Sequence, residues 1–242
     1  MAATTSKGRG RAVVSERKRA RPLSPDGIVA AALALVEAEG LAALTTRRLG
    51  EALGCQAMSI YHHFPSKQHL LDALVDHAIA TVEIPPPGPA PVERLRRLAH
   101  AYRAVAHRHP QLFPLIAVHR LNTPTGVRFI ESVLALVEAV VAERERAARY
   151  FRVLGYYLVG AALDETAGYA KGPSAAAPVS DEYVALHCPR LIAAGAYFKP
   201  AHWDATFALG LDALLAEMAA GTSTPLAAAP RPRVRPKLPT AT

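Results

Sequence analysis

Two short helix-forming runs, separated by a single glycine, mark the first third of this 242-residue sequence. The first run begins at Thr45, whose hydroxyl can cap a helix, and it carries Leu49 and Leu53 at helical spacing. Gly54 then favours a tight turn, and a second short helix is expected from about 57 to 63. Two short helices joined in this way predict a helix-turn-helix unit.

The second of these helices carries an unusual row of rings. Tyr61, His62 and His63 stand side by side, which is not normal for a buried core helix. A helix-turn-helix places its second helix in the DNA major groove while the first helix crosses the phosphate backbone. In that geometry Tyr61 and His63 would donate to phosphate oxygens, Ser59 or His62 would reach base edges, and Ile60 would point inward.

Helical periodicity continues along nearly the whole chain. Ser24-Pro25-Asp26 is a helix start, with a capping hydroxyl, a proline at the first helical position and an acid in the first turn. A fourth helix is expected from about Lys67 toward the PPPGPAP linker at 85–91. Further helical patterns, with no convincing alternating strand, run over about 92–108, 111–119, 127–145, 149–170, 181–195 and 201–219. We predict an all-α fold of about nine to ten helices.

Proline-rich stretches divide the chain into four expected segments. The linker at 85–91 breaks any helix, and the end of the chain is rich in proline, alanine and arginine. We expect a basic flexible arm over 1–22, a three-helix DNA-binding domain with the helix-turn-helix over 23–84, a ligand-binding and dimerisation domain over 85–220, and a disordered basic tail over 221–242.

The excess of positive charge lies at the two ends of the chain. The formal net charge is +8, and residues 1–22 hold seven lysines and arginines against one acid, while 225–242 hold four and no acid. We expect Arg17, Arg19 and Arg21 to reach DNA beside the recognition helix, as arginine arms do in the minor groove. The alternative is that both basic ends only keep the protein soluble.

Several classes of protein are disfavoured by what the sequence lacks. No stretch of about 18 apolar residues predicts a membrane span, and the N-terminus lacks the apolar region of an export signal. The two cysteines, Cys55 and Cys188, are far apart and fit a reducing cytoplasm. No GxSxG, GxGxxG, HExxH or Walker loop supports an enzyme. We therefore expect a cytoplasmic protein that is neither an enzyme nor a membrane protein.

The first domain resembles the DNA-binding domain of the tetracycline-repressor (TetR) family of bacterial transcription regulators. The resemblance covers residues 23–80 and is carried by LTTRRLGEALG at 44–54 and MSIYHHFPSKQHLLDAL at 58–74. Where the tetracycline repressors proper carry Gln and Pro, this chain has Ala57 and Met58, so its operator should differ. The positions that the resemblance implies for DNA contacts are Thr46, Arg47, Ala57, Met58, Ser59, Tyr61, His62, His63 and Lys67.

The second half is similar to the C-terminal domain of the tetracycline-repressor branch, through VHRLNTPTG at 118–126, GAALDE at 160–165 and FALGLDALL at 207–215. In that branch a histidine and an acid help to hold a magnesium–drug chelate, and His119 and Asp164 fall on those positions. The match is partial, because the histidine that binds the drug in that branch, late in the fourth helix, aligns here near Glu83. We therefore expect a small-molecule effector other than tetracycline and no cofactor, since any divalent metal would arrive with the ligand.

Aromatic residues and broad apolar faces complete the expected second domain. Tyr102, Phe113, Tyr156 and Phe129 would line an effector pocket, unless they are core residues. A helix-turn-helix that reads a palindrome needs a second copy about 34–36 Å away, so we expect a homodimer paired through helices near 149–170 and 201–219. The predicted dimer interface consists of Phe151, Leu154, Leu158, Phe207, Leu211, Leu214 and Leu215, unless these residues are intramolecular core.

These features together predict a ligand-responsive transcriptional regulator, a repressor that a small molecule releases from a palindromic double-stranded DNA operator. Two alternatives remain open. One is an architectural DNA-binding protein that its basic ends drive without ligand control. The other is a helical enzyme that uses the pocket of the second domain.

Overall fold

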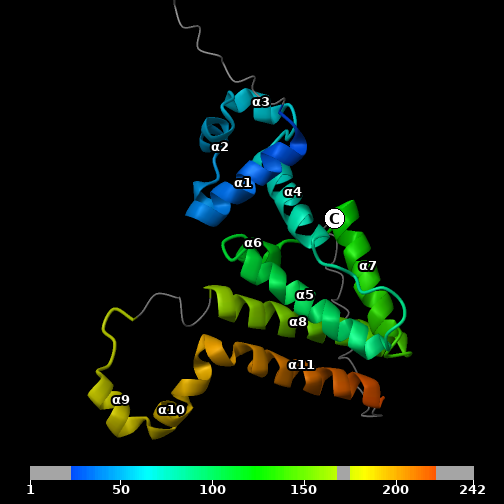
Figure 1. Ribbon diagram of the computed structural model, residues 1–242, viewed down its shortest axis with the longest axis vertical. Helices are drawn as coiled ribbons and strands as arrows, with labels where there is room; N and C mark the ends of the chain where they lie inside the picture. Colours follow the sequence, from blue (N-terminus) through cyan, green and yellow to red (C-terminus); the bar gives the residue numbers. More distant parts are fainter. Residues whose placement is uncertain (1–22, 168–174, 222–242) are drawn as a thin grey trace, which may run out of the picture. The chain divides into compact units, whose positions relative to one another are not determined.

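The computed structural model describes residues 23–167 and 175–221, and these ranges are built of helices (Figure 1). They contain eleven α-helices and three short 3-10 helices, with no strand in the described ranges. The all-α prediction is confirmed, while the expected number of nine to ten helices was too low. The predicted arm over 1–22 and all of the predicted tail except Gly221 lie outside the described residues.

The chain forms two compact units that divide between His77 and Ala78. The division falls inside a helix, seven residues before the boundary that the proline linker predicted. The helices that begin in the first unit are α1 (Pro25–Glu39), the 3-10 helix η1 (Leu41–Ala43), α2 (Thr46–Leu53), α3 (Ala57–Tyr61) and α4 (Lys67–Ala80).

Local signals set the ends of α1, and apolar side chains hold the first unit together. The Ser24 hydroxyl accepts a hydrogen bond from the Gly27 amide at 3.2 Å, as a helix cap should. Ile28, Ala32 and Val36 recur on one face of α1 and are completely buried. They share the core of this unit with Leu44, Leu49, Ile60, Leu70 and Leu74. The three-helix head therefore has a real hydrophobic core of its own.

The second unit is a bundle in which α8 is the central helix. In Figure 1, α8 is flanked by α5 and α11, and it also packs against α6 and α7. The elements of this unit are α5 (Pro91–Arg108), α6 (Phe113–Val118), α7 (Pro124–Glu138), α8 (Arg144–Ala167), α9 (Asp181–His187), α10 (Pro189–Ala194), η2 (Gly195–Phe198), η3 (Pro200–His202) and α11 (Trp203–Ala220).

One expected helix of this unit is broken in two. The pattern over 181–195 forms α9 and α10, which separate at Cys188 because Pro189 starts a new helix. This segment extends away from α8 and α11 in Figure 1. It exposes several large apolar side chains, namely Tyr183, Leu186, Leu191 and Ile192, and the following η2 exposes Tyr197 and Phe198. Such a surface on a folded chain indicates a place where another molecule packs.

An ionic network with a buried Arg103–Glu165 pair at its centre joins α5, α8 and α11. The Arg103 guanidinium donates to both oxygens of Glu165, at 2.7 and 3.0 Å, and to Asp204 at 2.7 Å. It also lies 4.6 Å from the centre of the Phe207 ring. His107 contacts Glu165 at 2.8 Å. Burial by itself would lower the pKa of Arg103, but its hydrogen bonds to Glu165 and Asp204 outweigh burial and raise that pKa.

Candidate nucleic-acid interface and effector pocket

The turn between α2 and α3 is built from local features of the sequence. The Thr45 hydroxyl accepts from the Arg48 amide at 3.2 Å and caps α2, as expected. Gly54 ends α2 in the left-handed conformation with φ of 66°, which favours glycine. Gly50 lies so close to the turn that a Cβ there would stand 2.8 Å from the Cys55 carbonyl oxygen. The two helices therefore meet through backbone, which fixes the direction of α3.

The residues predicted to contact DNA lie largely on the surface of this unit. Ile60 is buried, as expected from its place on the inner face of α3. The α3 helix is shorter than expected and ends at Tyr61, so His62 and His63 follow it in a turn. Among the predicted contacts, Thr46, Ala57 and Ser59 are half-buried, and those exposed are Arg47, Met58, Tyr61, His62, His63 and Lys67. Arg17, Arg19 and Arg21 lie outside the described residues.

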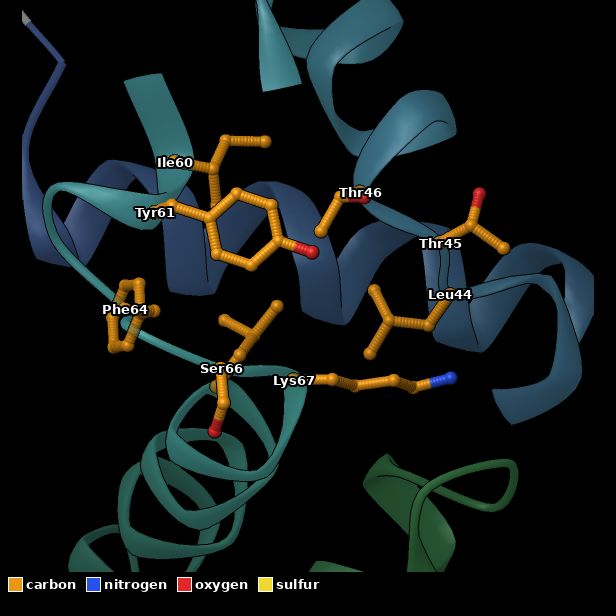
Figure 2. Close-up of a pocket in the computed structure, with 9 residues that line it drawn as sticks. Leu44, Thr45, Thr46, Ile60, Tyr61, Phe64, Ser66 and Lys67 are labelled. Carbon is orange, nitrogen blue, oxygen red and sulfur yellow. The ribbon is translucent and has the colours of Figure 1, made fainter. Parts of the chain in front are cut away.

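Three of the predicted contacts come from three different helices and meet at one small hollow. Figure 2 shows Thr46 at the start of α2, Tyr61 at the end of α3 and Lys67 at the start of α4 around this hollow. Its volume is only about 10 Å³, which leaves no room for more than a water molecule. The hollow is therefore no effector site. The fold instead brings a hydroxyl, a phenol and an ammonium group, all able to donate to phosphate, to one part of the surface.

A larger cavity lies in the second unit, between α5, α6, α7 and α8. Its volume is about 340 Å³, within the range of small-molecule sites. Tyr102, Phe129 and His119 all line it, as predicted, among mostly apolar neighbours. The Tyr102 and Phe129 rings are nearly parallel, with 18° between their planes and 6.4 Å between their centres. Burial raises the pKa of Tyr102 to about 12, so its hydroxyl keeps its proton.

The other predicted ligand residues do not line this cavity. Phe113 is fully buried and packs edge-on against Tyr102, with ring centres 5.9 Å apart. Asp164 and Tyr156 line a separate, more open hollow of about 600 Å³ along α8 and α11, together with Trp203. A chelate site shared by His119 and Asp164 is therefore not assembled within one chain. No group of three or more metal-ligating side chains occurs in the part of the chain that the structure describes.

The two charged lining residues of the 340 Å³ cavity, both arginines, were missed from the sequence. Arg120 and Arg152 both reach it, from the end of α6 and from α8. Arg120 follows His119 directly, so its position next to a predicted ligand residue was the available signal. Arg152 carried no signal, because only the packing of α8 places this residue at the cavity, with its guanidinium over the Tyr156 ring.

The predicted dimer interface needs a correction at the level of residues. Leu154, Leu158, Phe207, Leu211 and Leu215 are all buried inside the chain's own bundle, so they have almost no surface for a partner. Only Phe151 and Leu214 remain half-buried. The faces of α8 and α11 that reach the surface instead carry Val153, Tyr156 and Leu209, of which Leu209 is 73% exposed. The intramolecular-core alternative holds for the five buried residues.

Models of two protein families match the chain. The family described as bacterial regulatory proteins, tetR family, matches residues 28–74, and the tetracyclin repressor-like C-terminal domain matches residues 85–221. These ranges cover both units. Within the described ranges, none of the helices combines the length and apolarity that a membrane span requires.

Individual relatives agree with the family models. The chain is 30% identical over 206 residues to the class A tetracycline repressor from transposon 1721 of Escherichia coli, covering 78% of this chain and 87% of that protein. It is 30% identical over 149 residues to the transcriptional repressor DrrR1 of Streptomyces coeruleorubidus, covering 59% of this chain but only 54% of that protein. The crystal structure of Streptomyces coelicolor ActR in complex with actinorhodin is similar with a TM-score of 0.68 and 28% identity, covering 84% of this chain and 98% of that one.

Proposed function

The chain belongs to the tetracycline-repressor (TetR) family of bacterial regulatory proteins, and we propose that it is a repressor that a small molecule releases from a palindromic DNA operator. The observation that carries the proposal is the combination of two features in one chain. The first unit exposes donors around a helix-turn-helix, and the second unit encloses a cavity of small-molecule size. The matched relatives are regulators, and enzymatic activity forms no part of the proposal.

On DNA, we assign different roles to the exposed residues of the first unit. Thr46, Tyr61 and Lys67 meet at one hollow and hold phosphate groups, while Met58 and His62 face the bases of the major groove. Phosphate contacts set affinity for every sequence, and base contacts set preference among sequences. Arg17, Arg19 and Arg21 add a basic arm upstream of α1.

The active form is a homodimer, because one helix-turn-helix reads only half of a palindrome. The exposed apolar side chains of α8 and α11, above all Tyr156 and Leu209, supply the surface that a second copy would cover. The exposed apolar residues of α9 and α10 form a separate apolar surface, since this segment extends away from α8 and α11. Four helices, two from each copy, would then pack as a bundle.

The cavity of the second unit is the effector site. ActR has been crystallised in complex with actinorhodin, and the class A relative is a tetracycline repressor, which supports a small-molecule effector for this chain. An effector would release DNA only as far as it binds the DNA-free arrangement of helices more tightly than the DNA-bound one. Operator DNA is present in the cytoplasm, so the protein acts there.

Selection of bound sequences from random DNA duplexes tests this function. A TetR-type dimer should enrich a palindrome whose half-sites lie about one DNA turn apart. Enrichment of no shared sequence, together with a steep loss of affinity on adding salt, would instead support the architectural alternative. Release is tested next, by adding candidate effectors to the protein bound on its selected palindrome. Persistent binding at saturating effector would contradict release while leaving DNA recognition intact.

Two substitutions in the first unit separate affinity from preference. Tyr61→Ala removes a phosphate donor, so it should weaken binding to all duplexes by a similar factor, and because the phenol carries no charge it should leave the salt dependence unchanged. His62→Ala should change which bases are preferred, by about 1–3 kcal/mol at the affected position. Fluorescence anisotropy with a panel of duplexes measures both. Arg108→Gln, at an exposed position of the second unit, serves as the control and should leave both quantities unchanged. Indistinguishable profiles for the two variants would refute the assigned roles.

A further inference from the structure

The ionisable side chains that carry charge in the described lining of the 340 Å³ cavity are all basic. Arg120, Arg152 and His119 line it, and no aspartate or glutamate is among its lining residues. Arg120 makes no side-chain ion pair within the described residues. Arg152 donates to the neutral Tyr156 hydroxyl at 3.2 Å and lies 4.9 Å from the centre of that ring. Among the residues that the structure describes, no carboxylate therefore pairs with either guanidinium.

Other arginines of the same unit do form ion pairs with glutamates. Arg103 pairs with Glu165, Arg149 with Glu145 and Arg97 with Glu93. A guanidinium presents paired N–H donors that match the two oxygens of a carboxylate. Arg120 and Arg152 are both exposed, so they stand where the cavity opens to solvent.

Two aromatic rings, those of Tyr102 and Phe129, lie in the mostly aliphatic lining of the cavity. Tyr102 and Phe129 lie nearly parallel, and Phe113 packs behind Tyr102 and supports its ring. Because the Tyr102 hydroxyl keeps its proton, these rings add no negative charge. A planar ring packs well against such a pair, with edge or offset contacts to both aromatic side chains.

We infer that the effector is an aromatic anion, with a planar ring system against Tyr102 and Phe129 and an acidic group held by Arg120 and Arg152. The inference rests on the proposed function only in using this cavity as the effector site. Cationic compounds are disfavoured, since they would meet two guanidiniums without a carboxylate to pair with. Neutral compounds of the same shape keep the ring contacts but lose the charge-assisted hydrogen bonds.

A matched pair of probes tests the inference on the full chain. Anthraquinone-2-carboxylate and anthraquinone-2-carboxamide have almost the same shape and differ in charge. Isothermal titration should give an affinity for the acid that is about tenfold or more above that for the amide, because charge-assisted hydrogen bonds are about 1.5–3 kcal/mol each. The preference should shrink as salt is raised, since the arginines lie at the mouth of the cavity.

Variants locate the charge that makes the difference. Arg120→Gln and Arg152→Gln should each weaken binding of the acid and leave binding of the amide within about twofold. Phe129→Leu should weaken both probes. Arg128→Gln is the matched control, because Arg128 is exposed on the neighbouring helix α7 and does not line the cavity. Equal affinities for acid and amide, no binding of either probe, or arginine variants that behave like the Arg128 control would overturn the inference.

The charge preference of the effector and its release of the protein from DNA can fail independently. If the acid binds as expected but leaves the protein on its selected palindrome, the charge preference stands and release fails. If only neutral or cationic compounds release the protein from that palindrome, release stands and the aromatic-anion inference fails.

Discussion

Gly50 shows how one missing side chain shapes the DNA-reading surface. Its Cα faces the turn between α2 and α3, where a Cβ would meet the Cys55 carbonyl oxygen at 2.8 Å and the Ala57 amide at 3.5 Å. Both atoms belong to the backbone, so neither can move aside without moving the start of α3. The direction of α3 therefore depends on the absence of a side chain at Gly50.

Gly50→Ala is accordingly expected to destabilise the first unit and to weaken operator binding. Overpacking of this kind lowers the stability of a protein by about 1–3 kcal/mol, which is more than the stability added by the higher helix propensity of alanine. Urea unfolding measures the first effect and anisotropy the second. Glu51→Ala, at the exposed neighbouring position, should leave stability within about 0.5 kcal/mol. An alanine at 50 that behaves like the control would show that the turn tolerates the added methyl group.

The ionic network between α5, α8 and α11 shows how the relative positions of three helices are stabilised. Arg103 and Glu165 are both buried, and the pair is bidentate. A buried ion pair stabilises the fold little more than apolar residues of the same size would. Removing one partner, however, is strongly destabilising because it leaves a charge in the core without its main partner. The network therefore penalises any arrangement of the three helices that separates these two side chains.

Glu165→Ala should be strongly destabilising, by about 3–5 kcal/mol, because Arg103 stays buried without its main partner. The double variant Arg103→Met/Glu165→Leu removes both charges and should recover much of that loss. Chemical denaturation of the wild type and the two variants gives the comparison. A double variant less stable than Glu165→Ala would contradict the argument.

Asp204 gives the network a dependence on acid. Its hydrogen bond from Arg103 holds the pKa of Asp204 below its ordinary value of 3.8. A carboxyl with a lowered folded pKa adds stability above the unfolded pKa, and that stability is lost as the pH falls through the folded value. The melting temperature of the wild type should therefore exceed that of Asp204→Asn at pH 6, and this difference in melting temperature should shrink below pH 3.8. Thermal melts from pH 7 to 3 test this, and a difference independent of pH would exclude the ionic contribution.

At the scale of the whole molecule, the proposed function requires two copies, and we propose that they meet at the exposed faces of α8 and α11. Leu209 and Tyr156 are large, apolar and exposed in the single chain, and both border the same open hollow. A surface of this kind is usually covered in the working assembly.

Leu209→Asp should therefore convert the dimer into monomers and lower operator affinity, since each half-site would be bound separately. Analytical ultracentrifugation and anisotropy measure the two effects. Val127→Asp introduces the same charge at an exposed apolar position of α7 and should preserve the dimer. Dissociation by both variants, or by neither, would move the interface away from α11.

Signals that act over a few residues were readable from the sequence alone. Thr45, Gly54 and the Ser24-Pro25 pair determined where helices begin and end, because caps and turns involve neighbours within about four residues. The helix-turn-helix, the all-α class and the family followed from the same short stretches. The break at Pro189 was equally local, and the periodicity on both sides of it obscured that signal.

Tertiary structure decided everything that depends on distances between helices. It separated His119 from Asp164 into different cavities, paired Arg103 with Glu165, and buried five of the seven predicted interface residues. Helical periodicity identifies an apolar face, but it does not specify whether that face packs on its own chain or on another. That choice depends on how whole helices pack, and the same packing brought Arg120 and Arg152 to one cavity.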